Sequence, residues 1–392
     1  RSIVPMATTL PTHTSLFTST HPLEHGVLAN STQGGSRFVP SARLRSFAQV
    51  ASAAGWRTAA FVSTAVLKRG SGIEAGFDEF DQPEGEQRDA EATTRAALAW
   101  LASTPRGPFF LWVHYFDAHW PYAPPPPYAT MFSTDRELEA AIAARGIPRT
   151  VLRPLANQTE ETRVSINLYD GELRFQDDQL ARLLAALEAR PDWDHTIVVI
   201  AGDHGEGLGQ HGEAAHGGTW DEQLRAPLLI RIPGEAPRRE GTLVTAVDVI
   251  PTLLGRLRAS ALSALLPQAS GRDVLAPGAR SLPVVSQDTG REREASEQRY
   301  ALTTDRWKFF RVEEKDGGVR LQLFDRSADP YELSDVSDRH PEVTQPLAAA
   351  LSLALDAQRR KASELHDGKA PATTPPDPEL LEPLRALGYL EP

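Results

Sequence analysis

The sequence predicts an α/β fold, in which helices cover both faces of a mostly parallel sheet. Three apolar runs have the length and composition of strands, and helical periodicity separates them; they are Thr58–Val62, Phe109–Phe116 and Val198–Ala201. This alternation is typical of parallel strands, because each crossover between them requires a long connection, usually a helix. From about residue 281 the pattern changes to short strands separated by turns, which indicates a second, antiparallel sheet. We therefore expect a main α/β domain over residues 1–275 and a smaller C-terminal subdomain over 276–392.

The predicted helices are recognised by their periodicity and by the residues that end them. Residues 44–55 carry apolar side chains at helical spacing and end at Gly55. The alanine- and leucine-rich stretch over 90–101 is stopped by Pro105 and Gly107. The remaining helices are expected over 165–190, 247–254, 341–360 and 380–390, with a Pro/Thr-rich linker over 370–377.

The long helix over 165–190 has an apolar side and a polar side. The apolar side is expected to consist of Ile166, Leu173, Leu180, Leu183, Leu184 and Leu187. Four acids of this helix would suit a metal ion, but a helix with its own apolar face is expected to expose its acids to solvent. These acids are Asp170, Glu172, Asp177 and Asp178. Asp248 is likewise interpreted as the N-terminal charge of its helix.

Composition excludes several classes of function. The chain has 392 residues, 41% of them hydrophobic, which is enough for a large core. The formal net charge of −11 is spread along the sequence, so nothing predicts a nucleic-acid-binding surface. No cysteine is present, which excludes disulfides and thiolate metal sites, and no apolar run has the length of a membrane span. The chain begins in mid-sequence at Arg1, so we expect any targeting segment or membrane anchor to lie upstream, and localisation and oligomeric state stay open.

The turn after the third predicted strand carries the first candidate site residues. Asp203 and His204 are potential metal ligands that directly follow this strand. In open α/β sheets, ligands bind beyond the carboxyl ends of the strands. Gly205, Gly207 and Gly209 would let the backbone turn sharply and pass close to a bound group. An ordinary acidic turn is the alternative for an isolated Asp-His pair.

A hydroxyl-rich stretch around Pro11 predicts a helix start near the N-terminus. The first turn of a helix presents free N–H groups and a positive dipole end to an anion. A hydroxyl held there, such as that of Thr9, could act as a nucleophile or bind a metal ion. The alternative is a threonine that only caps its helix.

Histidines in loops complete the set of candidates. His119 lies in a proline-rich aromatic loop beyond the Phe109–Phe116 strand, where a substrate-facing imidazole would be useful, and His216 precedes a pair of glycines. His114 lies inside that predicted strand, so we interpret it as a satisfied core histidine. Residues from about 130 to 161 are mixed and charged, and they are expected to form an insertion over the site, with a possible role as a lid.

Taken together, several stretches resemble the sulfatase family of the alkaline phosphatase superfamily, and the resemblance runs from Thr9 to Leu390. The stretches that carry it are Thr9–His13 with Ser15–Ser19, Pro22 and His25–Val27, then Gly55–Ala59, His114–Tyr122, Asp203–Glu206, Asp325–Leu333 and Leu384–Leu390. Their number and order carry the resemblance, since each alone is short. It implies an alkaline-phosphatase-like fold and a metal-dependent hydrolase of sulfate or phosphate esters.

The resemblance also implies roles for individual residues. Thr9 matches the position of the nucleophile, and Asp203 and His204 match metal-ligand positions, with Thr9 also bound to the metal. His119 and His216 match positions that contact the transferred group or protonate the leaving oxygen. The three histidines His13, His119 and His216 are thus expected to bind the anionic substrate or to act as the general acid, a role that suits an unperturbed pKa of about 6.5.

This sequence departs from the family pattern at informative positions. Classical sulfatases have Cys or Ser at the position of Thr9, oxidised to formylglycine; the Cβ methyl of threonine should block that aldehyde, so no formylglycine is expected. The motif's Arg is replaced by His13, and a Lys-containing motif by Val62–Thr64. These changes resemble the threonine-nucleophile phosphodiesterases, phosphonate hydrolases and phosphoethanolamine transferases of the superfamily. An imidazole ligand from His204 favours Zn or Mn over Ca or Mg.

Three functions therefore compete. The first is hydrolysis of a sulfate or phosphate ester through a threonine nucleophile. The second is transfer of the bound group to an acceptor hydroxyl. The third is a non-catalytic scaffold, because the family's first strand and N-terminal aspartate ligands should precede Thr9 and this chain starts at Arg1. We expect weak metal binding and little turnover from the chain alone.

Overall fold

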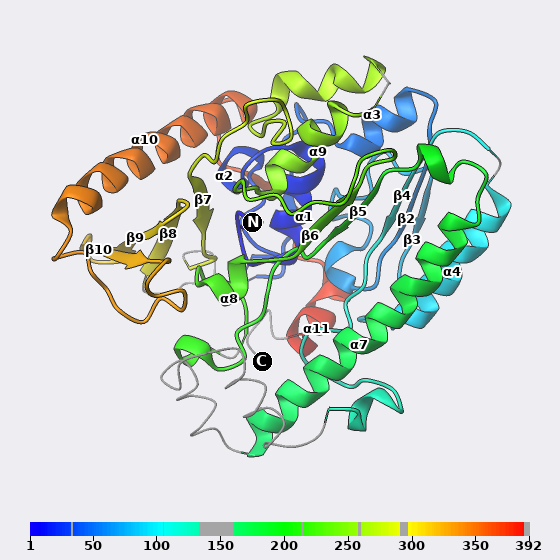
Figure 1. The fold of residues 1–392 in the computed structure, drawn as a ribbon, viewed down its shortest axis with the longest axis horizontal. Helices are drawn as coiled ribbons and strands as arrows, with labels where there is room; N and C mark the ends of the chain where they lie inside the picture. The colour runs from blue at the N-terminus through cyan, green and yellow to red at the C-terminus, as the bar shows by residue number, and fades with distance from the viewer. Residues whose placement is uncertain are drawn as a thin grey trace.

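The structure, a computed structural model, describes residues 1–32, 34–104, 106–132, 160–213, 215–257, 260–290 and 297–387. Most of the insertion expected over 130–161 therefore lies outside the described residues. The described helices and strands form an α/β layer with a separate antiparallel sheet beside it (Figure 1). This arrangement is the fold class predicted from the sequence.

The main layer contains a three-stranded parallel sheet in the order β3-β2-β4. Its strands are β3 (Glu79–Asp81), β2 (Arg57–Phe61) and β4 (Phe109–Val113), and Ala59 of β2 lies between Glu79 and Leu111 of its neighbours. Next to them in Figure 1 lies the antiparallel pair β5 (Val198–Ala201) and β6 (Leu228–Arg231). The three strands predicted in the main domain are thus all present, although the second ends at Val113.

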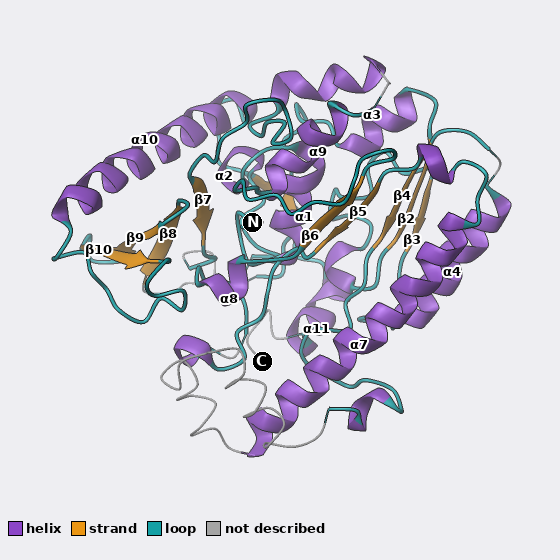
Figure 2. Ribbon diagram, viewed as in Figure 1, coloured by secondary structure: helices purple, strands orange, loops and turns teal. Residues whose placement is uncertain are grey.

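Helices cover both faces of this layer because successive side chains of a strand point to opposite faces. On one face, Phe109, Leu111 and Val113 pack against α4 (Ala90–Ser103) and α7 (Glu160–Glu188). On the other, Phe110 packs against α3 (Phe47–Ala53) and α9 (Ala246–Leu254). The first helix, α1 (Thr9–Thr18), lies on this second side, where Phe17 meets the ring of Trp112 (Figure 2).

The remaining elements are short or belong to the C-terminal part. They are α2 (Pro22–His25), β1 (Phe38–Val39), α8 (Asp221–Leu224), β7 (Val284–Gln287), β8 (Glu297–Thr303), β9 (Trp307–Glu314), β10 (Val319–Asp325), α10 (Pro341–Leu365), β11 (Ala372–Thr373) and α11 (Pro378–Ala386). Short 3₁₀ helices occupy Ala65–Leu67, Tyr128–Thr130, Trp193–His195, Gln210–Gly212 and Ser260–Gln268.

The C-terminal sheet has the antiparallel order β10-β9-β8-β7, and α10 packs on it through Leu351 and Leu355. Residues 370–377 were predicted to be a linker, but they contain the short strand β11, in which Thr373 pairs with Phe38 of β1. Helix α11 confirms the predicted tail helix, and its Leu384 is buried in the core that also contains Leu10. The end of the chain therefore contributes to the core of the main domain.

Two expectations for α7 are wrong. Leu173, expected on the apolar side, is 42% exposed, whereas Glu172, expected in solvent, is only 4% exposed. The Glu172 carboxylate accepts a hydrogen bond from the backbone N–H of Ala123, and burial raises the pKa of Glu172 to about 7. The loop after β4 folds over this helix and covers the carboxylate, a tertiary contact that helical periodicity does not reveal.

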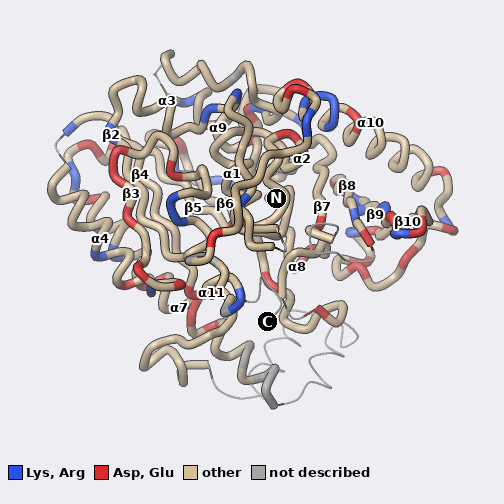
Figure 3. The backbone as a smooth tube through the Cα atoms, turned by 180° about the vertical axis from the view of Figure 1, so that it is seen from behind, with Lys and Arg blue, Asp and Glu red and all other residues tan. Residues whose placement is uncertain are grey.

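Charges are distributed as the composition suggests. Figure 3 shows acidic and basic residues interspersed over the outer helices and the C-terminal sheet. Asp248 confirms its interpretation as a helix-start charge, since it accepts a hydrogen bond from the backbone N–H of Thr245 in a capping box on α9. Among the described residues, none of the helices has the length and apolar character that a membrane span requires.

Candidate active site

Three distant segments meet at one end of the main sheet. The start of α1 supplies Thr9 and His13, one helical turn apart. The residue directly after β4 is His114, and the turn after β5 supplies Asp203 and His204. Both strands deliver these side chains at their carboxyl ends, which is where open α/β sheets place ligands.

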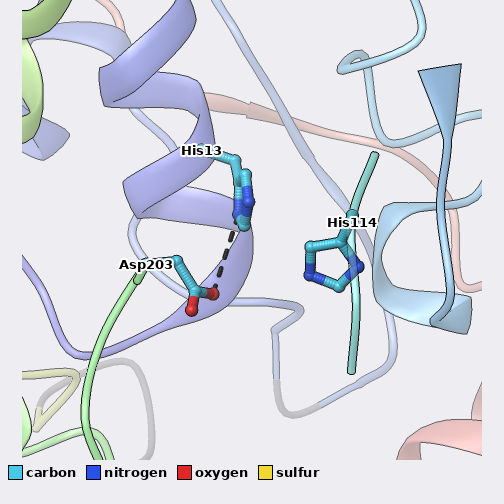
Figure 4. A group of neighbouring side chains, drawn as sticks. All are labelled: His13, His114 and Asp203. Atoms are coloured by element: carbon cyan, nitrogen blue, oxygen red, sulfur yellow. Dashed lines mark ion pairs between the residues drawn. The ribbon is translucent and has the colours of Figure 1, made fainter. Parts of the chain in front are cut away.

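His13, His114 and Asp203 form a group with the spacing of metal ligands, and they converge in Figure 4. One ligand atom from each lies within 4.8 Å of the others. The Nδ1 atom of His13 is 3.7 Å from the Oδ2 atom of Asp203 and 2.8 Å from the carbonyl oxygen of Thr9, to which it donates, so the ring nitrogen left for a metal ion is Nε2. Among the described residues, the buried Nδ1 atom of His114 has no hydrogen-bond partner, so it keeps a donor or acceptor for a bound group.

Electrostatics suit a cation at this group. Burial lowers the pKa of His13, and it lowers the pKa of His114 to about 3, so both imidazoles are neutral near pH 7. Burial alone would raise the pKa of Asp203, but the neighbouring His204 and His13 outweigh it and hold this pKa well below its usual range. Two neutral nitrogen donors and one carboxylate fit a divalent transition metal better than Ca²⁺ or Mg²⁺, which prefer oxygen ligands.

The Thr9 hydroxyl faces the imidazole of His204. The distance from Thr9 Oγ1 to His204 Nε2 is 3.4 Å, and His204 Nε2 is 3.6 Å from Asp203 Oδ2. The other ring nitrogen, Nδ1, lies 2.8 Å from the carbonyl oxygen of Gly205. A carbonyl oxygen only accepts hydrogen bonds, so Nδ1 donates to Gly205, and in the neutral imidazole Nε2 presents its lone pair to Thr9. That lone pair can accept the hydroxyl proton or bind a metal ion shared with Thr9.

A second histidine pair adjoins this contact. The Nε2 atoms of His119 and His216 are 3.0 Å apart. The centroid of the His216 ring is 4.2 Å from the centroid of the His204 ring. Each outer nitrogen faces a carbonyl oxygen, since His119 Nδ1 contacts Trp120 and His216 Nδ1 contacts Ala7. Both Nδ1 atoms therefore donate, and the Nε2–Nε2 contact needs one additional proton between the rings.

Glycines shape the turn that holds Asp203 and His204. A Cβ atom at Gly205 would lie 2.0 Å from the carbonyl oxygen of Glu222, so this turn and α8 can pack together only without a side chain there. Gly209 has a φ of 97°, a conformation that L side chains rarely adopt. The close approach predicted for the glycine-rich turn is thus to a neighbouring segment of the same chain.

The structure brings the six candidate residues into one network of contacts, namely Thr9, His13, Asp203, His204, His119 and His216. Their chemical roles remain predictions. The interpretation of His114 as a satisfied core histidine is wrong, because β4 ends one residue earlier and Nδ1 has no partner. The signal that could have found it is its place at the end of a strand, the same signal that identified Asp203.

Comparisons with known proteins identify relatives of this chain. The sequence profile of one family, Sulfatase, matches residues 2–259. Arylsulfatase K of Gallus gallus is 33% identical over 181 residues, which make up 44% of this chain and 33% of that protein. The alignment thus spans about a third of that relative's length.

Two solved structures share the fold. A candidate sulfatase of Bacteroides fragilis, yidJ, superposes with a TM-score of 0.77 at 19% identity, covering 93% of this chain and 88% of that one. The phosphonate monoester hydrolase of Agrobacterium radiobacter gives a TM-score of 0.67 at 21% identity, covering 92% and 88%. At sequence identities this low, the similarity to these two structures shows a shared fold and nothing more specific.

Proposed function

This chain belongs to the sulfatase family, and from that premise we propose that it acts as a metal-dependent hydrolase of sulfate or phosphate esters with Thr9 as the nucleophile. The observation that carries the proposal is the contact between Thr9 Oγ1 and Nε2 of His204, 3.4 Å apart and beside Asp203. The proteins that it resembles in sequence or fold include an arylsulfatase and a phosphonate monoester hydrolase, which supports esters of sulfur or phosphorus as the substrate class.

The residues proposed to hold the metal are Asp203, His204 and Thr9, as expected from the sequence, and the geometry adds His13 and His114. Zn or Mn suits this mixture of imidazole and carboxylate donors. When bound, such an ion would lower the pKa of a coordinated hydroxyl and polarise an ester oxygen. The buried, unpartnered Nδ1 of His114 supports a ligand role, because an orphan polar atom at this depth is costly unless something binds it.

In the proposed reaction, Thr9 Oγ1 attacks the phosphorus or sulfur atom of the ester. As this bond forms, the hydroxyl proton of Thr9 passes to a water molecule, because His204 Nε2 is assigned to the metal ion. The bond to the leaving alcohol oxygen breaks as the bond to Thr9 forms, which gives a covalent ester on Thr9. Water then attacks that ester, releases sulfate or phosphate and restores the threonine hydroxyl.

The His119–His216 pair is proposed to bind the substrate and to protonate the leaving oxygen. With one proton shared between its Nε2 atoms, 3.0 Å apart, the pair would carry a positive charge that suits an anionic ester. His13, whose Nδ1 lies 2.8 Å from the carbonyl oxygen of Thr9, orients the start of α1 as well as facing Asp203. The N-terminal turn of α1 adds its positive dipole end on the same side.

Replacing Thr9 tests this proposal directly. Thr9→Ala in the metal-loaded protein is expected to abolish turnover of p-nitrophenyl phosphate and p-nitrophenyl sulfate while leaving the thermal unfolding midpoint nearly unchanged. Thr14→Ala is the matched control, since Thr14 lies on the same buried helix but its hydroxyl bonds only the carbonyl oxygen of Leu10. Activity that survives in Thr9→Ala, or that Thr14→Ala loses equally, would refute the nucleophile assignment.

A further inference from the structure

A fully buried lysine joins the C-terminal sheet to the main domain. Lys308 on β9 has no exposed surface, and its Nζ atom lies 2.8 Å from Asp221 Oδ1 and 2.8 Å from Glu332 Oε1. Arg326, which follows β10, lies 2.8 Å from the other oxygen of Asp221. Two cations and two carboxylates thus balance within the contact. Burial opposes ionisation of Asp221, but Lys308 and Arg326 outweigh it and hold its pKa well below the usual range.

Asp221 is the only member of this network that comes from the main domain, and it is the first residue of α8. The backbone N–H of Asp221 donates to Glu332 Oε2 at 3.0 Å. The preceding Trp220 packs its ring against Phe310 and Phe324 of the same sheet, with ring centroids 5.1 and 5.8 Å away. The start of α8 is therefore fixed to the C-terminal sheet by both charge and packing.

The segment just before this anchor carries His216. Gly217 and Gly218 lie between His216 and the anchored residues, and glycines contribute much conformational freedom and no side-chain packing. The other end of the segment is held where His216 Nδ1 contacts the carbonyl oxygen of Ala7, 2.9 Å away. Between these ends, the carbonyl oxygen of Gly217 accepts a hydrogen bond from the N–H of Thr289, and the N–H of Gly218 donates to Gln223 Oε1 on α8. The place of His216 relative to His119 thus depends on where α8 is anchored, among other contacts.

We propose that Lys308, together with Asp221 and Glu332, is a positioning element that sets His216 against His119 for protonation of the leaving group. This inference rests on the proposed function. Removing the Lys308 ammonium leaves two buried carboxylates with one remaining cation, so the start of α8 must shift or admit water. A displacement of about 1 Å in a reacting group can cost about 10²-fold in rate.

The dependence of kcat on the leaving group of the ester separates a positioning role of Lys308 from a general loss of folded protein. A weakly basic leaving group such as p-nitrophenolate needs little protonation, whereas phenol or an alkyl alcohol needs a general acid. Lys308→Met is expected to lower kcat for phenyl esters by about 10-fold or more and to change kcat for p-nitrophenyl esters by less than about 3-fold. A loss of folded protein would lower both equally, and that outcome would overturn the proposal.

A double-mutant cycle with His216→Ala sharpens the test. If Lys308 acts through His216, Lys308→Met adds little further loss once His216 is absent. Fully additive losses would contradict the proposal. Arg306→Gln is the control, because Arg306 pairs with Asp325 at the exposed surface of the same sheet and should leave both esters unaffected. If Lys308→Met fails to fold, Arg326→Gln, which removes only one contact to Asp221, replaces it with the same expectations.

A spectroscopic measurement keeps this inference separate from the proposed function. Wild-type full-length protein that turns over neither ester when loaded with metal would refute the proposed function. In that event, ¹⁵N NMR spectra of the protein with labelled histidines test whether Lys308 positions His216. The His216 and His119 resonances should shift in Lys308→Met and should not shift in Arg306→Gln. Unchanged His216 and His119 resonances in Lys308→Met would overturn the inference.

Discussion

Replacing His114 by phenylalanine separates metal binding from folding in this protein. His114 is buried after β4 among aromatic rings, with the Trp112 and Phe116 rings each 6.0 Å from its own. Phenylalanine keeps an aromatic ring at this position and removes both ring nitrogens. Because Nδ1 of His114 is buried without a partner, its removal should leave the metal-free protein as stable as before or slightly more stable.

The expected loss of metal affinity follows from the number of donors. A structural zinc site with four ligands binds with roughly 10–16 kcal/mol, so each ligand contributes about 2.5–4 kcal/mol. Since about 1.4 kcal/mol corresponds to tenfold, His114→Phe should weaken zinc binding by about 10²–10³-fold. A histidine that only fills space would give no change in affinity.

Competition with a chromophoric chelator measures this affinity, and thermal unfolding of the metal-free protein measures stability. His195→Phe is the control, because His195 is exposed in a short 3₁₀ helix away from the candidate site. Zinc affinity that is unchanged in His114→Phe, or reduced equally in His195→Phe, would refute the assignment of His114 as a ligand.

Two further predictions concern stability. Gly205→Ala places a Cβ atom 2.0 Å from the Glu222 carbonyl oxygen, so it should lower the thermal midpoint strongly, whereas Gly241→Ala, which has nothing within 4 Å, should not; equal midpoints would contradict this packing argument. Burial raises the pKa of Asp288 from 3.8 to about 6, so its carboxyl stabilises the fold below pH 3.8 and loses that contribution as the pH rises through 6. Relative to Asp288→Asn, the wild type should therefore lose about 2 kcal/mol of unfolding free energy between pH 4 and pH 6.5, at ~1.4 kcal/mol for each unit between the two pKa values. Urea unfolding across this range measures it, and a constant difference between the proteins would contradict the burial of this carboxyl.

The fold class was predictable because local patterns decide it. Three strands of the main domain, β2, β4 and β5, are short apolar runs, and the helices between them show periodicity and end signals that act within a few residues. The small C-terminal sheet was equally visible from its turns. Pairings between distant segments could not be predicted from the sequence. Phe38 pairs with Thr373, and no local property of either residue identifies its partner.

The candidate site was predictable where a residue type and its place at the end of a strand agreed. Asp203 and His204 met that condition, and Thr9 was found from a helix-start pattern and a family resemblance. His114 was missed because an unbroken aromatic run predicted that the strand would continue past Val113. Glu172 was misplaced for a related reason, since the loop that covers it comes from residues almost 50 positions earlier in the chain.

Trapping the covalent intermediate tests the central claim most directly. The metal-loaded protein is mixed with a fast ester substrate, quenched in acid during turnover and digested, and the peptides are examined by mass spectrometry. The mechanism predicts a phosphoryl or sulfuryl group on the peptide that contains Thr9, located on the Thr9 hydroxyl and absent from Thr9→Ala. Turnover with the modification on another residue, or with none on Thr9 under conditions that trap the step, would contradict it.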